Sequence, residues 1–134
     1  MVILLTIPII IISLVIVWWF ATRINTTFAT KALLEFHHLD ISISTTITDE
    51  HDISVLREIL RGNSFSDSFP CNFTRRISIT MTDGSRSIMF HPATDGCPIL
   101  RLGDSDRYIR ITEEARTRLN EVVAKYGMFF PAIN

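Results

Sequence analysis

Apolar residues dominate the first part of the chain and predict a membrane-spanning helix. From Val2 to Ala21 there are 20 residues without a charged side chain. At about 1.5 Å per residue, a helix of this length spans roughly 30 Å, the thickness of the hydrocarbon core of a bilayer. The run is longer than the apolar core of a secretory signal peptide, and no basic residue precedes it. We therefore expect residues 1–22 to remain attached as a transmembrane signal-anchor helix, with residues 2–21 in contact with the lipid bilayer.

The next segment, residues 23–36, has apolar side chains four positions apart, at Ile24, Phe28, Ala32 and Phe36. This spacing places them along one side of an α-helix. The segment also lacks the glycine and proline residues that are typical of flexible linkers. The pattern predicts a juxtamembrane helical stalk that continues the membrane helix outward.

Beyond the stalk, the apolar pattern first changes to a period of two and then returns to helical spacing. Leu39, Ile41 and the apolar residues after them alternate with polar residues up to position 47, as in a half-buried strand. Residues 49–62 then predict a helix, with Thr48 or Asp49 as its N-cap and a glycine as its C-terminal stop. Asp52, in the first turn, is interpreted as part of the cap.

Short alternating segments follow and predict a series of strands joined by turns. The expected strands cover residues 75–82, 86–91, 97–102 and 107–111. Asp83 and Gly84 predict a two-residue hairpin turn between the first two of these strands, because glycine tolerates positive φ. The last predicted element is a helix over residues 112–126, for which Thr112 is the expected N-cap.

These segments together predict an α+β fold with the order strand, helix, four strands, helix. We expect a two-layer domain over residues 37–134, with an antiparallel sheet of about five strands and two helices packed on one face.

The chain has two cysteines, Cys71 and Cys97. In an antiparallel meander they lie before the second and fourth strands, at the same edge of the sheet, so we expect a disulfide between them. A pair of buried free thiols is the alternative. A disulfide requires an oxidising compartment, which places the domain outside the cytoplasm, in the periplasm or at the cell surface. Arg23 and Lys31 follow the apolar run and weakly favour the opposite orientation.

Charge and motifs argue against several classes of function. The 13 basic and 14 acidic residues nearly balance, so there is no electrostatic basis for binding nucleic acid. The sequence has no glycine-rich phosphate loop, zinc-binding spacing or nucleophile motif. His37, His38 and Asp40 are possible metal ligands, but they form an incomplete set. We expect no catalytic activity, no cofactor and no metal.

The sheet face opposite the helices is the candidate binding face. Strand alternation places hydroxyl groups, arginines and one tyrosine on this face, and arginine and tyrosine are common at binding hot spots. An ordinary solvated sheet face is the alternative interpretation. The candidate residues are Arg76, Thr80, Met89, His91, Arg101, Tyr108 and Arg110.

The sequence therefore predicts a single-pass, membrane-anchored protein with a small extracytoplasmic domain that binds a protein partner. An envelope-assembly subunit and an inhibitor or immunity-type factor both fit this description. The alternative is a membrane-tethered sensory domain for a small ligand or ion, and the third hypothesis is a hydrolase, which would turn over a substrate. Capture of another protein would favour the first function, and thermal stabilisation by a small molecule would favour the second.

Overall fold

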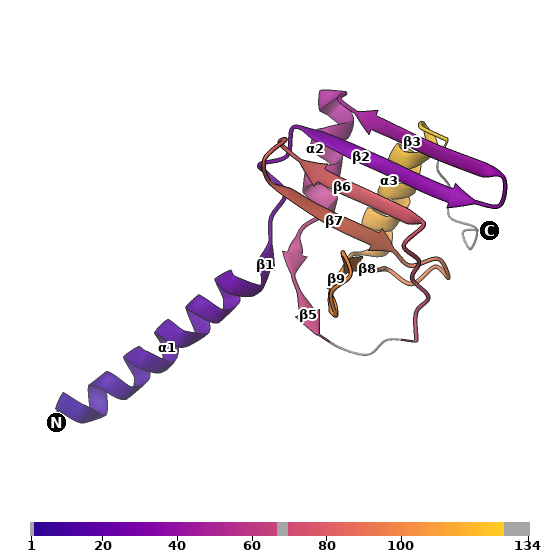
Figure 1. Ribbon diagram of the computed structural model, residues 1–134. Helices are drawn as coiled ribbons and strands as arrows, with labels where there is room; N and C mark the ends of the chain where they lie inside the picture. The colour runs from indigo at the N-terminus through magenta and orange to yellow at the C-terminus, as the bar shows by residue number, and fades with distance from the viewer. Residues whose placement is uncertain (1, 67–69, 128–134) are drawn as a thin grey trace.

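A seven-stranded antiparallel sheet forms the centre of the fold, and helix α1 projects away from it (Figure 1). The computed structural model describes residues 2–66 and 70–127; for residues 2–5 and His38 it describes the backbone alone. The elements are α1 (Val2–Thr22), β1 (Arg23–Ile24), β2 (Lys31–His38), β3 (Ile41–Ile47), α2 (Glu50–Ile59), β4 (Gly62–Asn63), β5 (Phe65–Ser66), β6 (Ile77–Thr82), β7 (Ser87–Pro92), β8 (Ile99–Leu102), β9 (Arg107–Arg110) and α3 (Glu113–Ala124).

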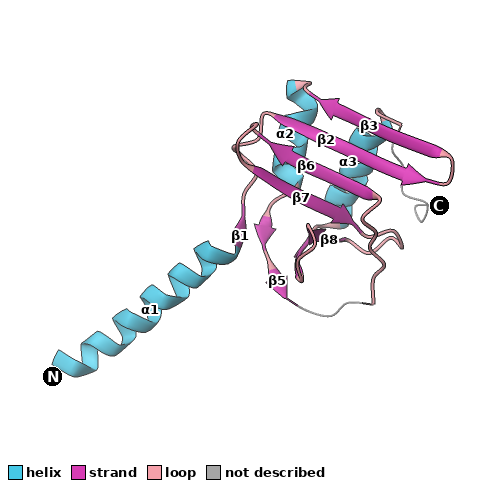
Figure 2. Ribbon diagram, viewed as in Figure 1, coloured by secondary structure: helices cyan, strands magenta, loops and turns pink. Residues whose placement is uncertain are grey.

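The order of strands across the sheet is β3-β2-β6-β7-β8-β9-β5, and β1 pairs with β4 in a separate two-stranded ribbon. Helices α2 and α3 lie behind the sheet, on the same face (Figure 2). The α+β class and the antiparallel sheet are thus confirmed. The expected number of strands was too low, because β2 falls in the predicted stalk and the strands β1, β4 and β5 have only two residues each.

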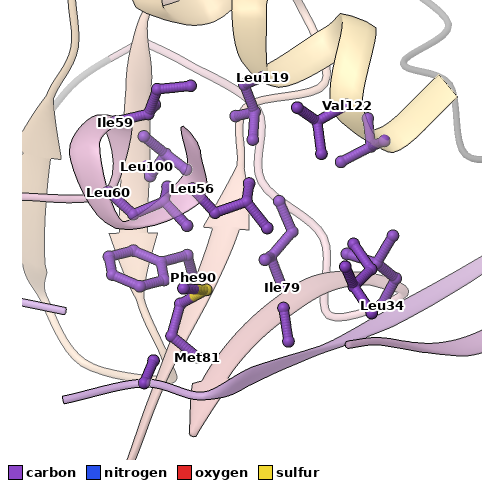
Figure 3. Close-up of a cluster of buried hydrophobic side chains, with 14 of the residues drawn as sticks. Leu34, Leu56, Ile59, Leu60, Ile79, Met81, Phe90, Leu100, Leu119 and Val122 are labelled. Carbon is purple, nitrogen blue, oxygen red and sulfur yellow. The ribbon is translucent and has the colours of Figure 1, made fainter. Parts of the chain in front are cut away.

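The hydrophobic core lies between the sheet and the two helices (Figure 3). Leu34 and Ile79 come from neighbouring central strands, whereas Leu56 and Leu119 come from α2 and α3. None of these four side chains is more than 2% exposed. Burial of this apolar layer provides the main driving force for packing the helices on the sheet.

Both helices of the domain begin at the residues that the sequence predicts. Asp49 is the N-cap of α2, and its Oδ1 accepts a hydrogen bond of 2.9 Å from the backbone N–H of Asp52. Thr112 is the N-cap of α3, and its hydroxyl oxygen accepts a hydrogen bond of 3.0 Å from the N–H of Ala115. These caps satisfy backbone donors in the first turn of each helix.

The prediction of a helical stalk over residues 23–36 is wrong. Residues 31–38 form β2, which lies between the edge strand β3 and β6. Ala32, Leu34 and Phe36 are fully buried, because alternate residues of a strand point to the same face. Burial in the sheet outweighs the helical propensity of this leucine- and alanine-containing segment.

The domain consequently begins before residue 37, and the segment after α1 is part of its packing. Thr26 is fully buried, and its hydroxyl lies 3.1 Å from the carbonyl oxygen of Arg57 and 3.0 Å from that of Leu60. The Nε of Arg57 in turn donates a hydrogen bond of 2.7 Å to the carbonyl of Ala29. The segment after α1 is therefore fastened to the C-terminal end of α2.

Two hairpins differ in detail from the prediction. Leu39 is not in a strand; it lies in the turn between β2 and β3, has a positive φ of 53° and is 90% exposed. Ile41 is also exposed, at 46%. Between β6 and β7 the loop covers residues 83–86, because Thr82 pairs with Ser87. Asp83 closes this longer loop by accepting hydrogen bonds from the N–H groups of Arg86 and Ser85, which also lower its pKa.

Helix α1 contains 21 residues and includes Pro8. All of its described large apolar side chains, from Ile7 to Phe20, are exposed. Within the part of the chain that the structure describes, no helix is both long enough and apolar enough to cross a membrane.

Candidate binding face

The candidate binding face is the outer face of the sheet, the side away from α2 and α3. Along β2 the buried side chains alternate with Leu33, Glu35 and His37, which are exposed. The same alternation in β6 and β7 places Thr80 and Met89 on the outer face, because their neighbours Ile79 and Phe90 are fully buried in the core. The outer face is therefore mixed, with charged, hydroxyl and apolar side chains.

An apolar strip crosses the middle of the outer face. Leu33 pairs with Thr80, and Thr80 pairs with Met89 on the next strand, so the three side chains lie side by side. Leu33 is 37% exposed and Met89 is 42% exposed. Together, Leu33, Thr80 and Met89 form the central strip.

The next cross-strand row, on β7, β8 and β9, contains three candidates from the sequence, and each of them already has a contact within the domain. Arg101 pairs with His91 on one side and Tyr108 on the other. His91 is only 4% exposed, and its Nδ1 lies 2.8 Å from the carbonyl oxygen of Ile77. It thus lies on the expected strand but is not accessible to a partner.

Arg101 braces the turn between β8 and β9. Its Nε donates a hydrogen bond of 2.8 Å to the carbonyl of Ser105, and Nη2 donates one of 3.0 Å to the carbonyl of Asp104. The carboxylate of Asp104 also forms an ion pair of 2.9 Å with Arg75. Arg76, the residue next to Arg75, is exposed just before β6. These contacts give Arg101 a structural role at the edge of the outer face.

Tyr108 belongs to an aromatic cluster that the strand pattern does not reveal. Its ring centroid lies 6.2 Å from that of Phe65, the residue with which it pairs on β5. It also lies 5.4 Å from the ring centroid of Phe73. All three side chains are half-buried. The phenylalanines in residues 63–74 were the sequence signal for this cluster. The pairing of β5 with β9 could not be predicted, because a strand of two residues is too short to show an alternating pattern.

Arg110 is separated from the other candidates. It lines a cavity of about 330 Å³ at which the end of α2, the end of β9 and the start of α3 meet. The seven candidate residues therefore do not form one continuous surface. Thr80, Met89 and Tyr108 belong to the outer face, and Arg76 lies exposed just before β6. His91 is buried, Arg101 is bonded to the β8–β9 turn, and Arg110 lines the cavity.

Cys71 and Cys97 form a disulfide, as predicted, with their Cα atoms 6.1 Å apart. Asp95 fastens both sides of this bond, since its carboxylate accepts hydrogen bonds from the N–H groups of Asn72, at 3.0 Å, and Cys97, at 3.3 Å. Cys71, Asp95 and Cys97 are the single grouping of potential metal ligands among the described residues. The two sulfur atoms are bonded to each other, so the cysteines are not available as thiolate ligands.

A buried carboxylate between the helices is the main polar feature that the sequence analysis misplaced. Asp52 does not cap α2. Its side chain accepts hydrogen bonds from the Nζ of Lys125, at 2.9 Å, and the hydroxyl of Tyr126, at 2.7 Å. The bonds from Tyr126 and Lys125 lower the pKa of Asp52, and the bond to Asp52 together with burial raises the pKa of Tyr126 to about 12. This cluster joins the start of α2 to the end of α3.

Comparison of the chain with protein-family models, curated proteins and solved structures finds no match. The functional argument therefore depends on the geometry of this molecule.

Proposed function

We propose that this chain is a single-pass, membrane-anchored protein whose small extracytoplasmic domain binds another protein and catalyses no reaction. The observation that carries the proposal is the apolar sequence run of residues 2–21, whose side chains the structure describes only from Thr6 onward. Its described large apolar side chains are 39% to 66% exposed, and the sequence run to which they belong contains 20 uncharged residues. A contiguous apolar surface of this size is unfavourable in water and is accommodated by a bilayer.

The junction between α1 and the domain supports a fixed rather than a freely hinged attachment. The carbonyl oxygen of Thr22 accepts hydrogen bonds from the backbone N–H of Ser64, at 2.6 Å, and from its hydroxyl, at 2.8 Å. Arg107 donates to the carbonyl oxygen of Ser64 at 2.9 Å. Arg23 pairs with Asn63 in the β1–β4 ribbon. The end of the helix is thus connected to the sheet by backbone hydrogen bonds.

The disulfide supports an extracytoplasmic position for the domain. Disulfides persist in the periplasm and at cell surfaces and are rare in the reducing cytosol. Cys71 and Cys97 are the only cysteines of the chain, and both are used in the bond. A subunit of an envelope assembly and an inhibitor or immunity-type factor both meet these requirements.

For the binding surface we propose the central strip, together with Tyr108 and Phe65, which lie farther across the sheet on β9 and β5. Leu33 and Met89 present apolar surface among hydroxyl-bearing residues, and methionine adapts its shape to a partner. Methionine and aromatic residues are enriched in protein interfaces, whereas charged residues are depleted from their centres.

The test is capture of the native partner from membranes of the source cells by the full chain and by a Leu33→Ser/Met89→Ser variant. Both side chains are exposed, so the variant should unfold within about 1 kcal/mol of the wild type, or about 0.5 kcal/mol for each position. Loss of central interface contacts should weaken capture by roughly thirtyfold. Leu39→Ser is the matched control, because Leu39 is an exposed leucine at the hairpin tip.

Undiminished capture by the double variant would exclude the central strip. Membrane attachment is tested separately by washing the membranes with alkaline carbonate, which releases peripheral proteins but leaves membrane-spanning ones in place. Release of the chain would contradict anchoring by α1, whatever the result of the capture experiment.

A further inference from the structure

Two side chains on the outer face of the sheet are buried, although strand alternation points them away from the helices. Ser78 precedes Thr80 of the central strip by two residues on β6. His91 follows Met89, the cross-strand neighbour of Thr80, by two residues on β7. Both therefore face the same side of the sheet as the central strip. Ser78 is only 3% exposed and His91 only 4%, so other segments cover this part of the outer face.

The β8–β9 turn forms one part of the cover. Arg101, the neighbour of His91 in the cross-strand row, donates hydrogen bonds to the carbonyl oxygens of two residues in this turn. Because Arg101 lies on the outer face, these bonds draw the turn over that face, toward His91. The turn also carries Asp104, whose carboxylate forms the ion pair with Arg75.

Residues 71–75, which we call the strap, form the other part of the cover. The strap is attached by backbone hydrogen bonds to the segment that follows β7. The N–H of Asn72 donates to the carboxylate of Asp95 at 3.0 Å, and its carbonyl oxygen accepts from the N–H of Thr94 at 2.8 Å. The strap thus begins close to the end of the strand that carries His91.

From this attachment the strap reaches the opposite end of the same cross-strand row. The ring of Phe73 lies on Tyr108 of β9, with the two centroids 5.4 Å apart. Tyr108 pairs with Arg101, and Arg101 pairs with His91. The strap and the β8–β9 turn therefore meet over the outer face, where the Arg75–Asp104 ion pair joins them.

The covalent bond is the strongest attachment of the strap. Cys71, its first residue, is bonded to Cys97. The side chains of Arg75 and Asp104 are 76% and 65% exposed, so solvent screens their ion pair and it adds little. Both cysteines are half-buried, which leaves the disulfide within reach of a thiol reagent.

We propose that the strap is a redox-sensitive cover: reduction of the Cys71–Cys97 disulfide by a dithiol releases it and uncovers Ser78 and His91 beside the central strip. A thiolate of the dithiol attacks one sulfur atom and breaks the disulfide bond, and its second thiol then displaces that sulfur. The two protons of the dithiol end on the cysteine sulfur atoms, and the dithiol becomes a disulfide. The inference rests on the proposed function, because the uncovered residues enlarge the surface proposed for the protein partner.

Release of the strap adds an imidazole acceptor to that surface. The Nδ1 of His91 lies 2.8 Å from the carbonyl oxygen of Ile77, which can only accept a hydrogen bond. Nδ1 therefore carries the proton, and Nε2 is the acceptor of the neutral ring. Once uncovered, Nε2 is open to a donor on the partner and to reagents that acylate imidazole.

The test measures acylation of His91 by diethyl pyrocarbonate in the full chain in detergent micelles. One sample is reduced with dithiothreitol, which is then removed without air, and the modified peptides are quantified by mass spectrometry. We expect His91 to react at least about tenfold faster in the reduced than in the oxidised protein, because local opening governs its rate. His51, exposed on α2, is the internal control and should react equally in both samples.

Two variants and a second measurement separate release of the strap from general loosening of the fold. Cys71→Ser/Cys97→Ser should react like the reduced protein without any reductant. Phe73→Ala keeps the disulfide and should accelerate the reaction of His91 less. Hydrogen exchange in the β2–β6 ladder should not change on reduction. An unchanged rate at His91 after reduction, or equal acceleration at His91 and in this ladder, would overturn the proposal. Neither readout involves the partner or the membrane, so the result is independent of the capture and carbonate experiments.

Discussion

The two halves of the seven-stranded sheet are held together by different interactions. We call β3, β2 and β6 the long-strand half and β8, β9 and β5 the short-strand half. Strands β2, β3 and β6 have 8, 7 and 6 residues, and the inward side chains of β2 and β6 are almost entirely buried. Strands β8, β9 and β5 have only 4, 4 and 2 residues. They are accompanied by a disulfide, by Arg101 on the β8–β9 turn and by Arg107 on Ser64.

This difference shows how a sheet is continued where apolar burial becomes limited. A two-residue strand forms few ladder hydrogen bonds and buries little surface, so its position depends on directed contacts from neighbouring segments. In the long-strand half, the same task is performed by alternating apolar residues that face the helices. We therefore expect the two halves to respond differently to the loss of apolar side chains and to the loss of the disulfide.

The largest effect is expected from Phe36→Ala in the long-strand half. Phe36 is fully buried on β2, and its truncation leaves a cavity in the core. The free energy of unfolding should fall by about 3 to 5 kcal/mol. Phe73→Ala is the matched change beside the short strands, where the ring of Phe73 packs on Tyr108 of β9, and the loss of this half-buried contact should lower the free energy of unfolding by about 1 kcal/mol. The measurement is chemical denaturation of both variants; equal losses would mean that the halves depend on burial alike.

Periodic segments account for the part of the fold that the sequence could predict. Helices α2 and α3, their N-caps Asp49 and Thr112, and the strands β6 to β9 all follow from local patterns. The disulfide was also predictable, because the order of strands in a meander brings Cys71 and Cys97 to one edge.

The remaining elements depend on interactions between distant segments. The apolar residues of positions 24 to 36 also fit a helical spacing, and only their place between β3 and β6 makes residues 31–38 a strand. For the candidate face, alternation correctly placed Thr80 and Met89. It could not show that Arg101 donates hydrogen bonds to the β8–β9 turn or that Arg110 lines a cavity between the end of α2 and the start of α3, because side-chain partners are decided by tertiary packing.

Removal of the disulfide by Cys71→Ser/Cys97→Ser tests the other side of the comparison. The two cysteines are 26 positions apart, and opening a loop of this length should lower the free energy of unfolding by roughly 3 to 4 kcal/mol. Hydrogen exchange should then increase first at the amides of Asn72 and Thr94, which bond across the disulfide-bonded segments. Equal acceleration at the β2–β6 ladder would show that the disulfide stabilises the whole sheet rather than its short-strand half.

Hydrogen bonds to Asp52 also join the two helices, where the hydrophobic core is well packed, and the third prediction tests how much they stabilise the fold. Asp52→Asn removes a buried charge that receives hydrogen bonds from Lys125 and Tyr126. The free energy of unfolding at neutral pH should fall by about 1.5 to 3 kcal/mol, the range for hydrogen bonds to a charged group. Glu121→Gln is the control, because it neutralises an exposed acid on α3 near Lys125 and should change stability by under about 0.5 kcal/mol.

The pH dependence of stability tests whether the charge of Asp52 causes the loss of stability expected in Asp52→Asn. Its pKa in the folded protein is lowered below the ordinary value of 3.8, chiefly by the hydrogen bond from Tyr126 and then by that from Lys125. The contribution of Asp52 to the stability of the fold is therefore complete above about pH 3.8 and is lost as the pH falls through the lowered pKa.

At the alkaline end, the raised pKa of Tyr126 means that its hydrogen bond to Asp52 stabilises the fold below pH 10 and is lost as the pH rises through about 12. The gap in stability between wild type and Asp52→Asn should accordingly be widest between these limits and narrow below pH 3.8, as measured by denaturation at a series of pH values. A gap that stays constant into acid would mean that the shape of the side chain, rather than its charge, joins α2 to α3.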